Sequence, residues 1–270
     1  MRTTMKRGAE KGLRLTLLAA GLWILPGVSA SAALHAQEAA APNAQDSQLQ
    51  ADVTKALDNK RFKDVKASAQ NGTVTLSGTV RTYADKEDAE KKTHHRKNVH
   101  AIQNLIQVAG VEVDDATLRN KLGEKLAYDR VGYGTTTFNA LTIGVQNGVV
   151  TLGGTAYGPI DKDSAVSLVS NYPGVKDVID NIEVAPLSPN DDRIRLEEAR
   201  TIYGFASLNR YALDPAKPIR ITVVNGNVTL SGVVDSQADK DTANIRANQV
   251  SGVFKVINQL QVAGKQEGQR

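Results

Sequence analysis

The chain has 270 residues, with 33 basic and 29 acidic side chains and no cysteine. Residues 1 to 36 hold five of the basic residues and one acidic residue, so the remainder carries 28 of each and no net charge. This balance gives no reason to expect a nucleic-acid partner, and the missing cysteine excludes disulfides and lipidation of an N-terminal cysteine.

The first 36 residues have the three-part pattern of a secretory signal peptide. Basic residues up to Arg14 precede an apolar run from Leu15 to Val28, and small residues follow. Because this run is shorter than the roughly 20 apolar residues that cross a bilayer, we expect cleavage and no membrane span in the mature protein. The protein is then periplasmic, or alternatively secreted. The candidate cleavage points follow Ala30, Ala32 and Ala36.

The polar, alanine-rich residues 37 to 45 predict a disordered spacer, after which one unit occurs three times. Its central motif reads NGTVTLSGTV at 71–80, NGVVTLGGTA at 147–156 and NGNVTLSGVV at 225–234. A helix-like segment with leucines at four-residue spacing, such as Leu118 and Leu122, precedes the motif. A charged helical stretch and an apolar strand follow it. Each unit is therefore predicted to fold as helix, strand, strand, helix, strand.

The first two strands of each unit alternate apolar and polar residues and meet at Asn-Gly, which favours a type I′ hairpin turn. A glycine that closes the second strand indicates a bend or a close backbone approach. A later glycine is expected in the left-handed cap of the second helix, where the first unit has Asn98. The predicted turn and bend residues are Asn71, Gly72, Gly78, Asn147, Gly148, Gly154, Gly174, Asn225, Gly226, Gly232 and Gly252.

V-T-L-S-G after an Asn-Gly hairpin, with G-V-x-x-V before the last strand, resembles the BON (bacterial OsmY and nodulation) domain family. The resemblance covers residues 46–108, 115–184 and 191–262. It implies an α+β fold of three tandem αββαβ domains, each a small mixed three-stranded sheet with both helices on one face. It also implies no catalysis, and binding of phospholipid surfaces or envelope partners. We predict domains at 46–110, 113–186 and 190–263, and a polar tail at 264–270.

Reactive chemistry is not indicated by any motif of the chain. No nucleophile elbow, phosphate-binding loop or dinucleotide fingerprint occurs. His95 and His100 have half of a zinc-ligand spacing, but no second ligand pair accompanies them. We therefore expect a protein that is not an enzyme and needs no cofactor or metal.

Two features are candidates for binding. The loops 128–138 and 203–211, which the first unit lacks, hold six of the eleven aromatic residues found after residue 36. Such rings suit an interface, or they cover the open face of the sheet or the adjoining helix. They are Tyr128, Tyr133, Phe138, Tyr203, Phe205 and Tyr211.

The second feature is the helix at 84–98, which carries polar residues where the second unit has apolar ones: Lys92 aligns with Leu168. The spans of the three units have net charges of +3, −2 and +1, so the positive excess gathers on the first. The basic residues, with the two histidines among them, are Lys91, Lys92, His94, His95, Arg96 and Lys97.

These residues predict peripheral association with anionic phospholipid membranes, in protection of the envelope against osmotic or other stress. The alternative is a protein-interaction or chaperone-like scaffold that uses the aromatic loops of the second and third units without binding lipid. Either partner, an anionic phospholipid surface or an envelope protein, agrees with the sequence. A solvated, loosely packed helix is the simpler interpretation of the basic segment.

Overall fold

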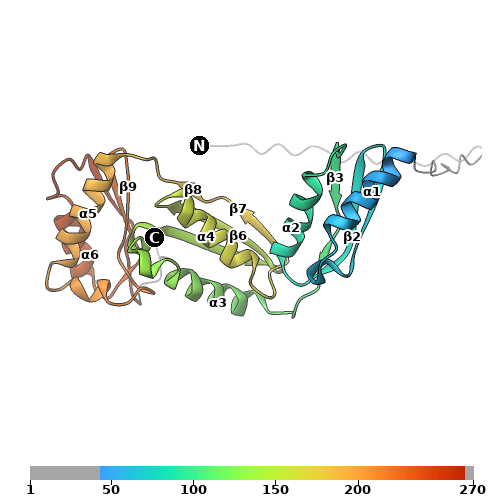
Figure 1. Cartoon of the computed structure of the whole chain (residues 1–270). Coiled ribbons are helices and arrows are strands. Elements are labelled where there is room, and N and C mark those ends of the chain that lie inside the picture. The colour runs from blue at the N-terminus through green and yellow to red at the C-terminus, as the bar shows by residue number, and fades with distance from the viewer. Residues whose placement is uncertain (1–42, 265–270) are drawn as a thin grey trace, which may run out of the picture. The chain divides into compact units, whose positions relative to one another are not determined.

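The computed structural model describes residues 43 to 264, which form three αββαβ domains in tandem (Figure 1). The α+β fold expected from the repeats is confirmed. The predicted signal peptide, residues 37–42 of the predicted spacer and residues 265–270 lie outside the described residues. The end of the predicted spacer is not disordered, because Asn43 caps α1 and Ala44 and Gln45 belong to this helix. Within the described part of the chain, no helix is both long and apolar enough to cross a membrane.

Domain 1 has two helices and a mixed sheet in which β2 is central. β1 pairs with β2 antiparallel, and β3 and β4 pair with β2 in parallel. The elements are α1 (Ala44–Ala56), the 3₁₀ turn η1 (Lys60–Phe62), β1 (Val65–Gln70), β2 (Thr73–Val80), α2 (Tyr83–His94), β3 (Ala101–Asn104) and β4 (Gln107–Val108).

Domains 2 and 3 repeat this order with the same pairings. Domain 2 consists of α3 (Asp115–Tyr128), η2 (Val131–Tyr133), η3 (Thr136–Phe138), β5 (Ala140–Gln146), β6 (Val149–Ala156), α4 (Pro159–Ser170), β7 (Asp177–Asp180) and β8 (Glu183–Val184). Domain 3 consists of α5 (Pro189–Tyr203), η4 (Asn209–Ala212), β9 (Arg220–Val224), β10 (Asn227–Ser231), β11 (Val233–Val234), α6 (Gln237–Ala247), β12 (Lys255–Asn258) and β13 (Gln261–Val262).

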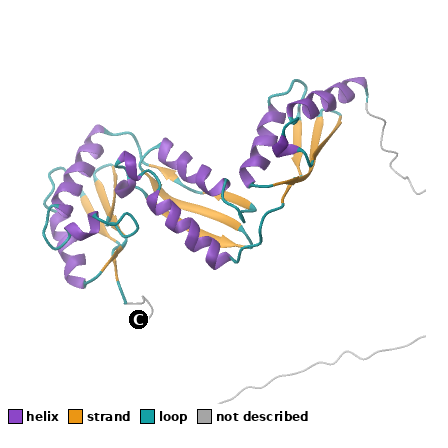
Figure 2. Ribbon diagram, turned by 60° about the horizontal axis from the view of Figure 1, so that its bottom comes forward, coloured by secondary structure: helices purple, strands orange, loops and turns teal. Residues whose placement is uncertain are grey.

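Both helices of a domain pack on one face of its sheet, as the helices and strands of the three domains in Figure 2 illustrate. In domain 1, Leu49 and Val53 of α1 share a buried cluster with Val74 and Leu76 of β2. The strand alternation then turns the intervening residues, such as Thr75, to the opposite face. That face is polar, which explains why a domain of this size is not obliged to cover it.

The three Asn-Gly turns have left-handed backbones at both positions, as a type I′ turn requires. The φ angles are 50° and 74° at Asn71 and Gly72, and the turns of domains 2 and 3 at Asn147, Gly148, Asn225 and Gly226 are alike. The bend glycines also have positive φ: Gly78, Gly154 and Gly232. A Cβ on any of them would collide with the backbone carbonyl oxygen of Asp64, Ala140 or Pro218 respectively.

The second helix of each domain ends earlier than expected. α4 ends at Ser170 and α6 at Ala247, whereas the left-handed Gly174 and Gly252 come four and five residues later. Asn171, which caps α4, has right-handed helical φ and ψ and donates its N–H to Ser167 O. The left-handed glycine therefore closes the turn between helix and strand rather than the helix itself.

An aspartate in the first turn of the first helix binds each hairpin turn, which the sequence analysis did not anticipate. The Asp46 carboxylate accepts the N–H groups of Asn71 at 2.8 Å and Gly72 at 3.0 Å. Asp115 and Asp191 bind the corresponding turns at 2.6–2.9 Å and 2.8 Å. A tight turn exposes these two adjacent N–H groups, and a carboxylate can satisfy both.

A second aspartate holds the connection between the first helix and the first strand. Asp85, Asp161 and Asp239 lie in the first turn of α2, α4 and α6 and are buried. Their partners differ between domains, because the connections differ in length. Asp85 accepts from Arg61 at 3.0 Å, Asp161 from Asn139 at 3.0 Å, and Asp239 from Tyr211 at 3.1 Å.

We predict that Asp191→Ala destabilises domain 3 by about 1–3 kcal/mol, because the part-buried N–H of Asn225 and the buried N–H of Gly226 lose their acceptor. Amide hydrogen exchange of residues 225–231 should become faster. The control is Asp241→Ala, which removes an exposed carboxylate of the same domain whose partner among the described residues is Gln237. Equal exchange rates in both variants would contradict the assigned role.

Candidate functional site

The basic cluster, Lys91, Lys92, His94, His95, Arg96 and Lys97, lies at the end of α2 and in the turn that follows. All of these side chains are exposed except that of Lys92, which is half-buried. No carboxylate of residues 43–264 lies within ion-pair distance of the four Lys and Arg side chains. The rings of His94 and His95 are perpendicular, with their centroids 6.1 Å apart. The cluster therefore presents its charge to solvent.

Small side chains allow α2 to pack although its last turn is polar. The helix buries Asp85, Ala89 and Thr93 at four-residue spacing, and the Thr93 hydroxyl donates to Ala89 O at 2.8 Å. The aligned helix α4 buries Val169 at the place of Thr93. The basic side chains also lie at the negative end of the helix dipole, where positive charge is favourable.

Three of the six predicted aromatic contact residues are used within the protein. Phe138 and Tyr211 are 8% and 5% exposed, and both belong to the core cluster of domain 3. The Tyr211 hydroxyl accepts from Asp235 N at 2.8 Å. The Tyr203 hydroxyl donates to Ile219 O and bonds Thr137 Oγ1 at 2.7 Å. Burial raises the pKa of Tyr203 to about 12.

The long loops thereby join domain 2 to domain 3. Arg220, at the start of β9, donates to the backbone oxygens of Thr136 at 2.8 Å and Asn139 at 2.9 Å. Burial of the Arg220 guanidinium lowers its pKa. The two backbone carbonyl oxygens hold this group in place. A structural role, which the sequence left open for these loops, accounts for Phe138, Tyr203 and Tyr211.

The other three rings remain accessible. Tyr128 and Tyr133 are 53% and 71% exposed, and Phe205 is 39% exposed. Arg130 stacks over Tyr133 at 3.8 Å, and Arg246 over Phe205 at 5.1 Å.

An open groove of about 820 Å³ separates α3 from α4 beside Tyr128. Its lining includes Leu168 and Tyr172, with Lys125 Nζ 6.0 Å from the Tyr172 ring. The sequence reasoning missed Tyr172 as a surface residue. The signal that could have found it was the alignment of this position with Arg96 of the exposed basic cluster.

Glu198 is a second residue that the sequence reasoning missed. Its side chain on α5 is 0% exposed, and neither carboxylate oxygen has a hydrogen-bond partner among the described residues. Counting from the hairpin-binding aspartates, it occupies the position of Val53 in domain 1 and Leu122 in domain 2, both 0% exposed. The neighbouring Arg195 donates instead to Asp192 and to Val223 O. Burial raises the pKa of Glu198 to about 8.

No group of three or more His, Asp or Glu side chains is placed to hold a metal ion within residues 43–264. Ser77 and Ser231, the serines that follow the hairpin motif, lie half-exposed on β2 and β10.

Comparison with known proteins identifies the family to which the three domains belong. A model of the BON domain matches residues 45–110, 114–186 and 205–264. The chain belongs to the BON domain family. The resemblance inferred from the motifs is thus confirmed. The third match begins at residue 205, so α5, the first helix of domain 3, lies outside it.

The BON protein is similar to Osmotically-inducible protein Y of Escherichia coli (strain K12). The two are 24% identical over 188 residues, which are 69% of this chain and 92% of that protein. Two structures of CdsD, a structural protein of the type III secretion system of Chlamydia trachomatis, cover 80% and 79% of the chain and 92% and 96% of their own. Their identities are 15% and 14% and their TM-scores 0.24 and 0.23, values that support no further argument.

We predict that Glu198→Leu stabilises domain 3 and flattens its pH dependence. Since the folded-state pKa is raised to about 8 from 4.5, the folded chain holds a proton between these values that the unfolded chain has lost. The free energy of unfolding of the parent therefore falls as pH rises through this window, by up to about 1.4 kcal/mol per pH unit. Urea unfolding at pH 5, 6, 7 and 8 measures the slope.

The control for this series is Glu197→Leu, a change at the half-buried neighbour whose carboxylate pairs with Arg193 at 2.8 Å. This variant should keep the pH slope of the parent. A slope that survives in Glu198→Leu would assign the pH dependence to another group.

Proposed function

We propose that this chain is a non-catalytic, exported protein that associates peripherally with anionic phospholipid surfaces through the basic cluster. The observation that supports this proposal is that the cluster is exposed and its Lys and Arg side chains have no ion-pair partner among residues 43–264. Charges already paired within the protein would gain little from phosphate headgroups.

The strength of this attraction is modest. Each basic residue near an anionic surface contributes about 1 kcal/mol, so four of them give weak, reversible binding. Domain 2, whose span has a net charge of −2, is not expected to face the lipid.

The setting of this activity is proposed from the leader-like sequence and the relative. Residues 1–36 have the pattern of a signal peptide, which would deliver the protein to the periplasm. The name of the E. coli relative refers to osmotic induction, and we propose that this chain acts in the same kind of stress.

A second candidate function is that of a protein-interaction scaffold. It is favoured by the α3–α4 groove, where Tyr128 and Tyr172 flank about 820 Å³ of open space. The aromatic rings that bind domain 2 to domain 3 are excluded from this role, because they are not free to contact a partner.

Replacing Lys91, Lys92, Arg96 and Lys97 together by Ser is expected to reduce co-sedimentation with vesicles of anionic phospholipid at least tenfold in Kd. The loss follows from removing four charges worth about 1 kcal/mol each. A matched control removes the same number of dispersed, exposed charges by changing Arg81, Lys121, Lys176 and Lys255 to Ser. Binding that is unchanged in the first variant, or lost equally in both, rules out the cluster as the contact.

Raising the salt concentration from 0.1 M to 1 M should release the protein from the same vesicles, because the Debye length falls from about 10 Å to about 3 Å. Tyr128→Ser with Tyr172→Ser should leave vesicle binding at low salt unchanged. Vesicle binding that persists at 1 M and disappears in this double variant would show that the rings, rather than the charges, make the contact.

A further inference from the structure

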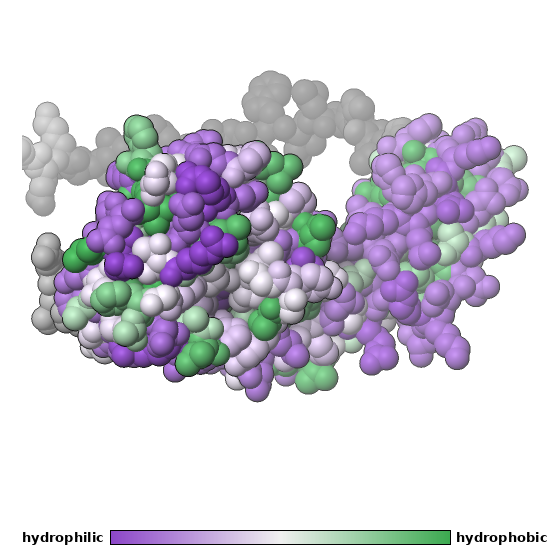
Figure 3. Space-filling model, turned by 60° about the vertical axis from the view of Figure 1, so that its left-hand side comes forward, coloured by the Kyte–Doolittle hydropathy of each residue, from purple (hydrophilic) through white to green (hydrophobic). Residues whose placement is uncertain are grey.

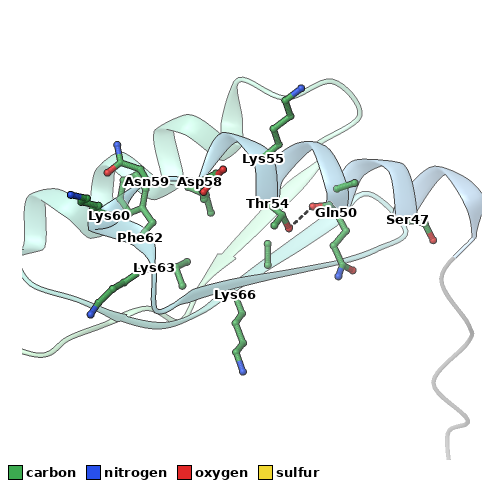
Figure 4. Close-up of a pocket in the computed structure, with 14 residues that line it drawn as sticks. Ser47, Gln50, Thr54, Lys55, Asp58, Asn59, Lys60, Phe62, Lys63 and Lys66 are labelled. Atoms are coloured by element: carbon green, nitrogen blue, oxygen red, sulfur yellow. Dashed lines mark hydrogen bonds between the residues drawn. The ribbon is translucent and has the colours of Figure 1, made fainter.

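A wide groove runs along domain 1 between α1 and the edge of the sheet (Figure 4). It encloses about 1250 Å³ and is open to solvent. Its apolar lining residues are Ala51, Leu57, Phe62, Val65 and Ala67, and its polar ones are Ser47, Gln50, Thr54, Lys55, Asp58, Asn59, Lys60, Lys63 and Lys66. We call it the β1 groove.

One wall of the β1 groove is a strand with an unpaired edge. Among residues 43–264, β1 pairs only with β2. Thr79 N donates to Asp64 O, so the alternation of an antiparallel ladder directs the backbone groups of Lys66 toward β2. Those of Val65 and Ala67 then lie on the outer edge, beside the groove. Such an edge can pair with another extended chain.

The corresponding strands of the other two domains, β5 and β9, take part in the contact between those domains. The equivalent space in domain 2, between α3 and β5, is reduced to about 80 Å³, and Arg220 of domain 3 lines it. In domain 3, β9 is the strand equivalent to β1, and its Arg220 bonds the η3 segment of domain 2. The longer α-to-β connections that make these contacts are missing in domain 1. The position of domain 2 that is equivalent to the β1 groove therefore receives Arg220, a residue on a strand of domain 3.

The side chains around the β1 groove are mainly positively charged. Lys55, Lys60, Lys63 and Lys66 line it, and Figure 4 shows the Lys55 and Lys66 side chains pointing outward from α1 and β1. Asp58 is the one carboxylate among the described residues of the lining. The ion pair of Lys63 with Asp64, at 3.8 Å, joins two exposed side chains and is easily replaced. In Figure 3, the visible surface of domain 1, at the right, is mostly hydrophilic.

We propose that the β1 groove binds an extended, acidic segment of a partner protein, which adds as a strand beside β1. The backbone of the segment would pair with Val65 and Ala67, its alternate apolar side chains would lie on the apolar lining, and its carboxylates would face the lysine rim. This inference goes beyond the proposed function, because it concerns another surface of domain 1 and a polypeptide rather than a lipid.

The test uses the full chain and a fluorescent peptide of alternating Glu and Val, with a Lys and Val peptide as the charge-reversed probe. Fluorescence anisotropy should detect the acidic peptide only. Lys60→Ser, Lys63→Ser and Lys66→Ser together should weaken it at least tenfold. The Lys91, Lys92, Arg96 and Lys97 to Ser variant, which removes four charges elsewhere on domain 1, one more than the triple variant, should bind it as the parent does.

Two further variants separate strand addition from charge attraction. Ala67→Pro removes an outward N–H from the edge, a position where proline is tolerated in strands, and should reduce binding at least tenfold. Ala51→Phe fills the groove from the exposed face of α1, leaves the backbone of β1 untouched and should do the same. Circular dichroism reports whether each variant is folded.

Bound acidic peptide should also slow amide hydrogen exchange in residues 65–69. The proposal would be overturned if the parent did not bind the peptide, or if the rim variant and the basic-cluster variant lost the same peptide affinity. Full peptide binding by both Ala67→Pro and Ala51→Phe would overturn it too. The proposal would also be overturned if Lys60, Lys63 and Lys66 were needed for binding to anionic vesicles but not for binding of the peptide. None of these results depends on whether the Lys91–Lys97 cluster binds lipid.

Discussion

The fold of each domain depends on one carboxylate that binds the backbone of a hairpin turn. The turn is left-handed at both central residues, and its adjacent N–H groups would lack a partner if they were buried against the first helix. Asp46 supplies that partner in domain 1, and Asp191 is 1% exposed in domain 3. Because the aspartate lies in the first turn of the helix, the bond fixes the helix at one end of the hairpin and brings its apolar residues over the buried face of the sheet.

With this scaffold constant, the segment between the first helix and the first strand decides what each domain can do. Domains 2 and 3 have long connections, whose buried rings and carbonyl oxygens join the two domains, as Phe138 and the bonds of Arg220 show. Domain 1 has the short connection around η1, so its edge strand and the β1 groove stay accessible. The connection between the first helix and the first strand is therefore used for contact in domains 2 and 3, and the same region is exposed in domain 1.

The charge of the protein follows the same division. Domain 1 carries the excess of positive charge, at the end of α2 and around the β1 groove, and both surfaces are exposed. Domain 3 instead buries a carboxylate, Glu198, where its relatives in the chain have Val53 and Leu122. Replacing an apolar core residue by an ionisable one lowers stability at the pH where it is charged. The pH response of the folded protein is therefore expected to come from domain 3, and its interactions from domain 1.

The sequence alone determined the repeats, the order of the elements, the Asn-Gly turns and the exposed basic cluster, because these depend on local patterns. It did not predict that Asp46 binds a turn 25 residues away, that two of the six aromatic rings would be buried and a third hydrogen-bonded inside the protein, or that one edge strand would stay open. These features depend on contacts between segments distant in the chain, and the same tyrosine is a surface residue or a core residue according to what packs against it. Only the tertiary structure could separate Tyr133, with its exposed ring, from Tyr211, whose hydroxyl holds a backbone N–H.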